Sequence, residues 1–394
     1  MKQIIITTIF SICVLNTYGQ DSLKWTFQAK SGIYTSAAAD RNNIYFGSND
    51  SNFYVLDKTN GNLKWKYKTN GQIKSQPALF DESVIINSSD GNLYSFDKNT
   101  GKILWIFKTK GEKRYDMWDY YLSSPITYQS TVYVGSGDGF VYAVGAKTGK
   151  LDWSFNTGDI VHATPVIERE KVFIGSYNGT FYSLDCKSGD LVWQFKTVGD
   201  RYFPKGEIQK GAAVYKNSII FGSRDYNIYS LDLSTGRGLW NMKEKYGSWI
   251  IAIPFVYKDK IYFGTSDSHQ FYSMNADGGN IEWALPINMR VYGSAASYND
   301  RIYFGCFNGK LYGVNPRTGK IEYTFQTYSS REKYPSIYRE NGEFREDFQL
   351  YGSDMQGSEK KILDLGSILA TPLIDEGVIY FGDSKGTFYA LKLK

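Results

Sequence analysis

The amino-acid sequence predicts an all-β fold, an eight-bladed β-propeller of four-stranded antiparallel blades. Three observations support this prediction. One segment recurs eight times along the 394 residues, an aromatic residue recurs beside it at nearly constant spacing, and the first and last units are incomplete in complementary ways. A period of roughly 40–45 residues with four strands per unit is typical of propeller blades.

The repeated segment consists of an apolar strand, a short turn and a second strand that usually ends in a polar residue. Two copies are "IYFGSNDSNFYVLD" from Ile44 and "VFIGSYNGTFYSLD" from Val172. The other copies begin at Val84, Val132, Ile219, Ile261, Ile302 and Ile379. Seven copies are followed by a second turn and a short strand with an aromatic residue, and these residues lie 40 to 48 positions apart: Trp65, Trp105, Trp153, Trp193, Trp240, Trp283 and Tyr323.

Each unit is expected to contain four strands. An inner strand opens with small residues and often Pro, as in "SSPITY" from Ser123. An alternating strand such as "KVFIGS", the turn at Asn178 and Gly179, the strand "TFYSLD" and the outer strand "LVWQF" follow in the same order. The second turn reads Asp-x-x-Ser/Thr-Gly, in which Gly permits a positive φ and the polar side chains bond the backbone.

The two ends of the chain predict how the ring closes. The eighth unit stops at Lys394 after its third strand, whereas "LKWTFQAK" from Leu23 is a fourth strand without its first three. We therefore expect the N-terminal strand, with Trp25, to complete the last blade, because closure removes unpaired blade edges.

The unit Tyr-x-Leu/Phe-Asp-x-x-Ser/Thr-Gly-x-x-x-Trp resembles the pyrroloquinoline-quinone (PQQ)-type repeat family over essentially all of the chain after residue 19. The family has a branch of quinoprotein dehydrogenases, which hold the quinone and a calcium ion on the propeller axis, and a non-catalytic branch similar to BamB. In both branches the repeat aromatic residue packs between neighbouring blades. The resemblance thus implies a structural, blade-docking role for Trp25, Trp65, Trp105, Trp153, Trp193, Trp240, Trp283 and Tyr323.

The first nineteen residues are predicted to be a signal peptide, because Lys2 precedes the apolar run "IIITTIFSICVL" and small residues follow. Residues 20–394 then form one eight-bladed domain, with an insertion at 328–366 before the last blade. The protein is expected to be extracytoplasmic, either periplasmic or secreted. Lipoprotein anchoring is disfavoured because Ile12 before Cys13 is large.

Composition excludes several functional classes. The formal net charge of +5 is small and dispersed, which argues against a nucleic-acid partner. No later apolar run is long enough to span a membrane. Cys186 and Cys306 have no CxxC pair and no nearby His, so no metal site is predicted. We expect a monomer.

The connections from each outer strand to the next inner strand vary in length and should share one face with the middle turns. Trp118 and Trp249, the two Trp residues outside the repeat, both lie in these connections. Two interpretations remain open: an aromatic recognition face, or rings that pack the loops onto the propeller rim. The candidate ligand- or partner-binding residues are Tyr115, Trp118, Tyr120, Tyr121, His162, Tyr202, Phe203, Lys210, Tyr246, Trp249, Tyr292, Tyr334 and Tyr338.

The longest charged stretch, Arg331 to Lys361, also has two interpretations. It is either a solvated, partly ordered excursion or a lid over the central channel, anchored by Tyr334, Tyr338 and Phe348.

The residues that open the inner strands should ring the channel mouth: Tyr34, Lys74, Leu122, His162, Lys210, Ile251, Tyr292 and Leu369. Among them, Lys74, His162 and Lys210 are candidates to meet an anion.

The sequence favours a non-catalytic binding or scaffold protein, and it names no catalytic residue. Asp116 and Asp119 break the repeat but have no evident partner. A quinoprotein-like oxidoreductase with PQQ and calcium is an alternative, although that branch uses adjacent cysteines, which this chain lacks. A carbohydrate-binding propeller is another. The expected partner is an envelope protein or peptide, or a carbohydrate, and no cofactor is expected.

Overall fold

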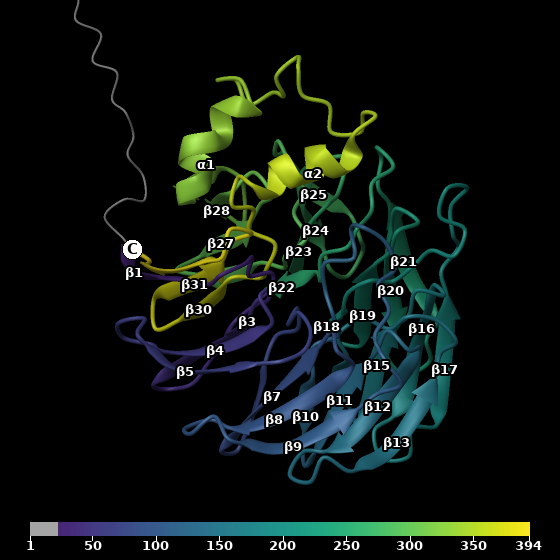
Figure 1. Ribbon diagram of the computed structural model, residues 1–394. Helices are drawn as coiled ribbons and strands as arrows, with labels where there is room; N and C mark the ends of the chain where they lie inside the picture. Colours follow the sequence, from purple (N-terminus) through teal and green to yellow (C-terminus); the bar gives the residue numbers. More distant parts are fainter. Residues whose placement is uncertain (1–22) are drawn as a thin grey trace, which may run out of the picture.

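Eight four-stranded antiparallel sheets form the computed structural model, which describes residues 23–394 (Figure 1). The predicted propeller is confirmed. In seven sheets the strands follow in chain order from inner to outer, and in blade 8 the outer strand is β1, beside β32. The predicted signal peptide lies outside the described residues.

The first four blades have short inner strands and longer outer ones. Blade 1 consists of β2 (Ala38–Ala39), β3 (Asn43–Gly47), β4 (Asn52–Asp57) and β5 (Leu63–Lys68). Blade 2 consists of β6 (Ala78–Phe80), β7 (Ser83–Ser88), β8 (Asn92–Asp97) and β9 (Ile103–Lys108). Blade 3 consists of β10 (Ile126–Tyr128), β11 (Thr131–Gly135), β12 (Phe140–Gly145) and β13 (Leu151–Asn156). Blade 4 consists of β14 (Val166–Glu168), β15 (Lys171–Gly175), β16 (Thr180–Asp185) and β17 (Leu191–Lys196).

The remaining blades repeat this pattern. Blade 5 consists of β18 (Ala213–Tyr215), β19 (Ser218–Gly222), β20 (Asn227–Asp232) and β21 (Gly238–Lys243). Blade 6 consists of β22 (Phe255–Tyr257), β23 (Lys260–Gly264), β24 (Gln270–Asn275) and β25 (Ile281–Pro286). Blade 7 consists of β26 (Ala296–Tyr298), β27 (Arg301–Gly305), β28 (Lys310–Val314) and β29 (Ile321–Gln326). Blade 8 consists of β30 (Leu373–Asp375), β31 (Val378–Gly382), β32 (Thr387–Lys392) and β1 (Leu23–Gln28).

The insertion before blade 8 contains the helical segments. These are α1 (Tyr328–Lys333), the 3₁₀ turn η2 (Tyr334–Ser336) and α2 (Met355–Leu363). Figure 1 shows α1 and α2 on the same side of the propeller. Neither helix within residues 23–394 has the length and apolar character that a membrane span requires.

An indole latch joins successive blades. The indole N–H of Trp153 in blade 3 donates a hydrogen bond of 2.9 Å to the carbonyl of Cys186, in the outer turn of blade 4. The ring lies against Gly189 of the same turn, where φ is +77° and an added Cβ would stand 2.5 Å from the indole. Gly is therefore required in this turn both for its backbone conformation and for the space that the indole fills.

Six other tryptophans repeat the latch. Their N–H groups donate to the next blade at 2.9–3.2 Å, and the residues are Trp25, Trp65, Trp105, Trp193, Trp240 and Trp283. Each ring contacts a Gly of positive φ in that blade: Gly61, Gly101, Gly149, Gly236, Gly279 and Gly319. The blade-docking role that the resemblance implied is thereby explained by one hydrogen bond and one ring contact.

Tyr323 occupies the aromatic position of blade 7, which faces blade 8. In blade 8 the outer strand is β1 rather than a continuation of β32, so no Asp-x-x-Ser/Thr-Gly turn joins the two strands. The Tyr323 ring packs on Tyr303 of its own blade, with ring centroids 5.8 Å apart, as Trp153 packs on Tyr133. Tyr thus replaces Trp at a junction where the usual turn is not formed.

The seam otherwise has the same geometry as the other blades. In every outer strand the residue before the aromatic position is bulged, as Val192 is between Leu191 and Trp193. In β1 the same shift separates Leu23 from Trp25. A bulge increases the strand twist and turns an edge away from further pairing.

Aromatic rings also stack between neighbouring sheets. The closest parallel pairs are Phe46–Phe388, Phe181–Phe221 and Phe271–Phe304, with centroids 4.2, 4.2 and 3.7 Å apart. The first of these pairs joins blade 1 to blade 8, so the core is continuous across the seam.

We predict that Gly189→Ala destabilises the protein more than Gly158→Ala. Both glycines have positive φ, +77° and +83°, but the added Cβ meets the Trp153 ring only at Gly189 and meets nothing within 4 Å at Gly158. The backbone penalty of about 1 kcal/mol should be common to both, and the clash should add about 1–3 kcal/mol at Gly189. Chemical denaturation measures the difference, and equal losses would contradict the latch.

Candidate functional site

The long connections emerge on the same face as the middle turns, as the sequence predicted. After β9, both the backbone N–H and the hydroxyl of Thr109 donate to the carbonyl of Gly91 in the middle turn, at 2.9 and 2.8 Å. The same backbone bond is made by Thr69, Thr157, Thr197 and Thr327. We call this side the decorated face, formed by the connections 109–125, 197–212, 244–254 and 327–372 and by the middle turns.

The connection 109–125 crosses the mouth of the central channel. The Tyr120 ring lies 5.7 Å from Tyr34 and 6.4 Å from Tyr292, measured between centroids. The Tyr121 hydroxyl donates to the carbonyl of Leu369 at 2.8 Å. A segment between blades 2 and 3 therefore contacts residues that precede blades 1, 7 and 8. We call Tyr120 and Tyr121 the tyrosine cap.

The insertion reaches the tyrosine cap through Glu359 on α2. This carboxylate accepts a hydrogen bond of 2.5 Å from the Tyr120 hydroxyl. It also accepts two bonds, of 2.9 and 2.7 Å, from one guanidinium nitrogen of Arg290. Both charged side chains are buried. The pair fixes the insertion to the ring, since loss of either partner would leave a buried charge uncompensated.

The rest of the insertion is anchored by aromatic rings. Tyr338 is 2% and Phe348 8% exposed. Tyr334 stacks on Tyr338 with centroids 4.4 Å apart and accepts a hydrogen bond from Asn288. These are the anchors that the lid interpretation named.

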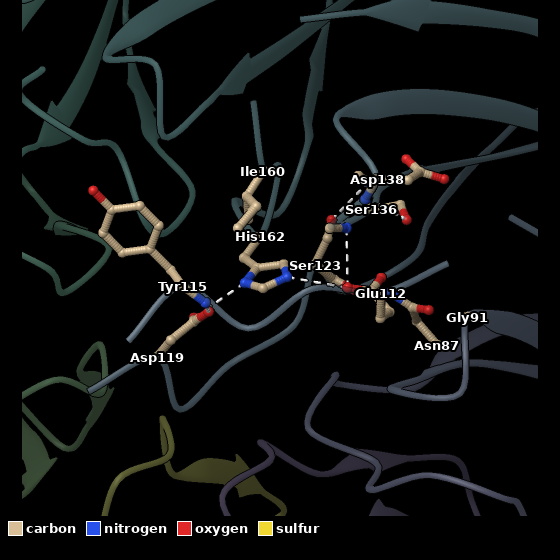
Figure 2. A network of polar contacts seen from close by, with 12 residues as sticks. Asn87, Gly91, Glu112, Tyr115, Asp119, Ser123, Ser136, Asp138, Ile160 and His162 are labelled. Carbon is tan, nitrogen blue, oxygen red and sulfur yellow. Dashed lines mark hydrogen bonds and ion pairs between the residues drawn. The ribbon is translucent and has the colours of Figure 1, made fainter. Parts of the chain in front are cut away.

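His162 joins the connection between blades 3 and 4 to the connection 109–125 (Figure 2). Its Nδ1 lies 3.0 Å from Asp119 Oδ1 and its Nε2 lies 3.1 Å from Glu112 Oε2. All three side chains are almost completely buried. An imidazolium that donates from both nitrogens satisfies this geometry.

The electrostatics agree with a charged His162. Burial opposes the charged form, but the charges and hydrogen bonds of Asp119 and Glu112 raise the pKa of His162 to about 9. Burial likewise works to raise the pKa of Asp119, yet the charge of His162 and several hydrogen bonds lower it overall. The cluster is therefore a buried ion triad at neutral pH.

The same network continues toward blade 5. The Tyr177 hydroxyl donates to Asp119 at 2.9 Å and accepts from the Gln209 amide at 3.1 Å. Arg224, which is 1% exposed, donates to Gln209 at 2.8 Å and to Asp116 at 2.6 Å. Both acids that break the repeat, Asp116 and Asp119, are thus tied to blades 4 and 5.

The predicted binding residues fall into three groups by exposure. The buried ones are Tyr120, Tyr121, His162, Trp249, Tyr292 and Tyr338. Those of intermediate exposure are Tyr115, Trp118, Phe203, Lys210 and Tyr334. Tyr202 and Tyr246 are exposed, at 72% and 65%. The rings of Trp118 and Trp249 pack edge to face with centroids 5.8 Å apart, which is the loop-packing interpretation.

Sequence reasoning did not find Glu112, Arg224, Arg290 or Glu359. Arg224 carried a weak signal, because it stands at the start of the middle turn in "FGSRDYN", where no other copy has a cation. The other three lie in connections whose course the repeat does not determine.

Two hollows adjoin the tyrosine cap. One, of about 70 Å³, lies in the channel and is lined by residues that include Tyr34, Lys74 and Lys210. The other, of about 230 Å³, is lined by residues that include Lys113 and Arg114. Lys74, Tyr121, Leu122 and His162 line both hollows. Five of the eight residues predicted to ring the mouth line the channel hollow, whereas Ile251, Tyr292 and Leu369 belong to the adjoining hydrophobic cluster.

Comparison with known families decides the classification. The family described as outer membrane protein assembly factor BamB matches residues 15–117, 121–243 and 204–394. The chain belongs to this family. No curated protein sequence matches it significantly.

Solved structures that resemble this BamB-family protein share its fold at low identity. The crystal structure of BamB from Moraxella catarrhalis has a TM-score of 0.70 at 15% identity, covering 95% of this chain and 98% of that one. A computationally designed protein has a TM-score of 0.70 at 15% identity, covering 94% and 98%. A europium-containing methanol dehydrogenase has a TM-score of 0.68 at 14% identity, covering 94% and 87%.

The quinone and metal of the dehydrogenase branch do not fit the residues of this BamB-family channel. Within residues 23–394, no three His, Cys, Asp or Glu side chains are grouped so that they could hold a metal ion. The tyrosine cap crosses the mouth, and the channel hollow beneath it is lined by no carboxylate that could hold a calcium ion. The two buried cysteines, Cys186 and Cys306, lie in different blades.

We predict that the two histidines titrate far apart. Burial beside Arg290 lowers the pKa of His269 to about 4, whereas His162 should titrate near 9. Because the chain contains only 2 His, two imidazole NMR signals report both values directly. The variant His162→Gln assigns them. A His162 signal that titrates near its ordinary value of 6.5 would show that the ion triad is absent.

The same shift predicts a pH-dependent stability. A folded-state pKa of about 9, above the ordinary 6.5, means that the His162 charge stabilises the fold fully below pH 6.5 and that this contribution is lost as pH rises through about 9. The stability lost in His162→Gln should therefore shrink across that interval, by roughly 2–3 kcal/mol. The control His269→Gln should show no such trend there, because its lowered pKa places its titration below pH 6.5. Parallel curves for the two variants would contradict this account.

Proposed function

We propose that this protein is a non-catalytic scaffold of the cell envelope that binds a protein segment through its decorated face. Membership of the family described as outer membrane protein assembly factor BamB supports the scaffold role and the envelope location. The observation that carries the proposal is a pair of strongly exposed tyrosines that stand on a buried aromatic layer.

The most exposed apolar residues of the connections lie on two neighbours, 197–212 and 244–254, whereas Tyr328, Tyr351 and Met355 of the insertion are 43–51% exposed. Val198 is 74%, Tyr202 72% and Tyr246 65% exposed. The two connections are joined by Phe203, whose ring lies 5.0 Å from that of Trp249. We call Val198, Tyr202 and Tyr246 the tyrosine platform. Large exposed tyrosines on a rigid base lose little entropy on binding and are enriched among interface hot spots.

Buried groups beneath the tyrosine platform hold it in place. The Arg224 guanidinium stacks 4.3 Å from the Trp249 ring, and Trp118 packs on the same indole. Arg224 is bound in turn to Asp116. The two connections that carry the platform are thus held through Trp249 by side chains from the connection 109–125 and from blade 5, which limits their freedom before a partner binds.

The charges around the tyrosine platform favour an acidic or polar partner segment. Arg201 lies 5.8 Å from the Tyr202 ring and Lys245 lies 5.4 Å from the Tyr246 ring. Both cations flank apolar surface, a combination that suits an extended peptide with apolar and acidic side chains.

The geometry of His162 argues against hydrolytic catalysis. Both of its ring nitrogens are occupied by carboxylates, so it has no free nitrogen with which to take a proton from a nucleophile. The ion triad therefore serves to position the connection 109–125.

We propose in addition that the protein is exported, with residues 1–19 as signal peptide, and that it works outside the cytoplasm as a monomer. Recognition of a carbohydrate rather than a protein remains the second candidate, since exposed tyrosine rings also suit sugar faces.

We predict that a photo-crosslinking amino acid at position 202 or 246 captures an envelope protein in cells. The same group at position 151, on the outer strand β13, is the matched control, because Leu151 is also 50% exposed but lies away from the decorated face. The double substitution Tyr202→Ala and Tyr246→Ala should weaken binding of the captured partner about 10- to 100-fold, as expected for two hot-spot residues.

The readouts separate the two candidates. Protein bands that are crosslinked from one of the two positions and are lost when the tyrosine at the other is changed to Ala support the proposal. Capture of glycan alone would favour the carbohydrate. Capture only from position 151 would contradict a binding role for the decorated face.

A further inference from the structure

Four hydroxyl groups, in two linked pairs, line the central channel beneath the tyrosine cap. Backbone N–H groups of one inner segment donate to hydroxyls of the next: Gln76 to Ser124 at 2.9 Å, Ser124 to Thr164 at 3.2 Å, Ser294 to Thr371 at 2.9 Å and Thr371 to Ser36 at 3.1 Å. Each hydroxyl oxygen thus already accepts a hydrogen bond from a backbone N–H, and its own O–H is free to donate. Within residues 23–394, none of these four O–H groups has a protein acceptor.

Two lysines share the hollow with these hydroxyls. Lys210 donates to the Tyr292 carbonyl at 3.0 Å and its ammonium lies 3.7 Å from the centre of the Tyr121 ring. Lys74 lines the same hollow. Neither lysine forms an ion pair with a carboxylate of residues 23–394.

The lining of the hollow contains many hydrogen-bond donors and no negatively charged side chain. Of its lining residues within 23–394, two are Lys and none is Asp or Glu; His162 also lines it, but both of its nitrogens already donate to carboxylates. The carboxylates nearest to it, Asp119 and Glu112, are already bound to His162. A buried ammonium without a counter-ion is costly, and an anion that accepts from it and from hydroxyls removes that cost.

We propose that this hollow is an anion site that binds a small oxyanion, either a free carboxylate of the size of acetate or inorganic phosphate. The ligand would accept hydrogen bonds from Lys74, Lys210, Ser36, Ser124, Thr164 and Thr371. We call these six residues the channel anion site.

The size of the hollow limits the ligand. Its volume of about 70 Å³ is enough for several water molecules, since one water needs roughly 10–15 Å³ of such space. A carboxylate or phosphate group, which replaces a few water molecules, fits such a space. The tyrosine cap closes this site toward the decorated face, so it is distinct from the tyrosine platform.

Binding should take up protons. Burial lowers the pKa of Lys210 to about 7, and burial together with the charge of Arg114 lowers the pKa of Lys74 to about 8. A bound anion favours the charged form of both lysines and must raise these values. For acetate, which stays ionised near neutral pH, the affinity should therefore fall as pH rises above about 7, by up to about tenfold per unit for each proton taken up.

The other titratable groups around the two lysines are accounted for. From the connection 109–125 they are Glu112, Lys113, Arg114, Asp119, Tyr120 and Tyr121; from other segments they are Tyr34, His162, Tyr292, Glu359 and Asp364. Burial raises the pKa of the tyrosines Tyr34, Tyr120, Tyr121 and Tyr292. His162 loses its charge only near pH 9, so the lysines dominate between pH 7 and 8.5 or so.

The test measures melting temperature and binding calorimetry of the full mature chain with sodium acetate and with sodium phosphate, against sodium chloride at equal ionic strength. At about 100-fold excess over Kd, the bound anion should raise the melting temperature by about 2–5 °C relative to chloride. Calorimetry at pH 8 in two buffers of different ionisation enthalpy should show proton uptake. Whichever of the two salts binds more tightly identifies the ligand class.

Three variants separate specific binding from a general salt effect. Lys210→Met and Lys74→Met should each weaken the binding at least tenfold, whereas the matched control Lys113→Met, which alters only the larger hollow, should leave it unchanged. Lys74→Met keeps the test valid if Lys210→Met fails to fold. Absence of a shift beyond chloride, or an equal shift in all three variants, would overturn the proposal.

Discussion

The contact between an indole and a glycine turn is the constraint on which the whole ring depends. A single four-stranded blade cannot bury its apolar faces alone. Each blade must therefore pack against the next at a fixed angle. In seven junctions the outer-strand Trp provides this link, with one hydrogen bond to a turn carbonyl and close packing against a Gly that tolerates positive φ. The same contact explains why the Trp and the Gly of the motif recur together along the chain.

A rigid ring allows the connections of one face to be fixed by a few buried charges. His162 holds Glu112 and Asp119, Arg224 holds Asp116, and Arg290 holds Glu359. Each of these groups spans different blades, which converts flexible connections into a preorganised surface. Buried pairs of this kind contribute more to a unique arrangement than to net stability. The tyrosine platform gains its support from them, and the channel beneath the tyrosine cap becomes a small separate compartment.

The fold was predictable because the sequence pattern of one blade recurs eight times in the chain. Periodicity, turn residues and the incomplete end units specify blade number, strand order and closure without tertiary information, and even the exception at Tyr323 coincides with the junction at the seam. The long connections occur once each, and their course depends on contacts between segments far apart in sequence. His162 was therefore recognisable as a channel residue, but its partners Glu112 and Asp119 were not. The sequence also could not show whether Trp118 and Trp249 face solvent or each other. An exposed binding surface and a packed loop both use aromatic residues.

Hydrogen–deuterium exchange along the whole chain tests the central claim that a latched, continuous ring carries fixed connections. The account predicts that the amides of β1 exchange as slowly as those of the other outer strands, and that the segment 112–122 is protected although it forms no strand. Rapid exchange of β1, with protection confined to blades 1 to 7, would show an open ring and contradict the account.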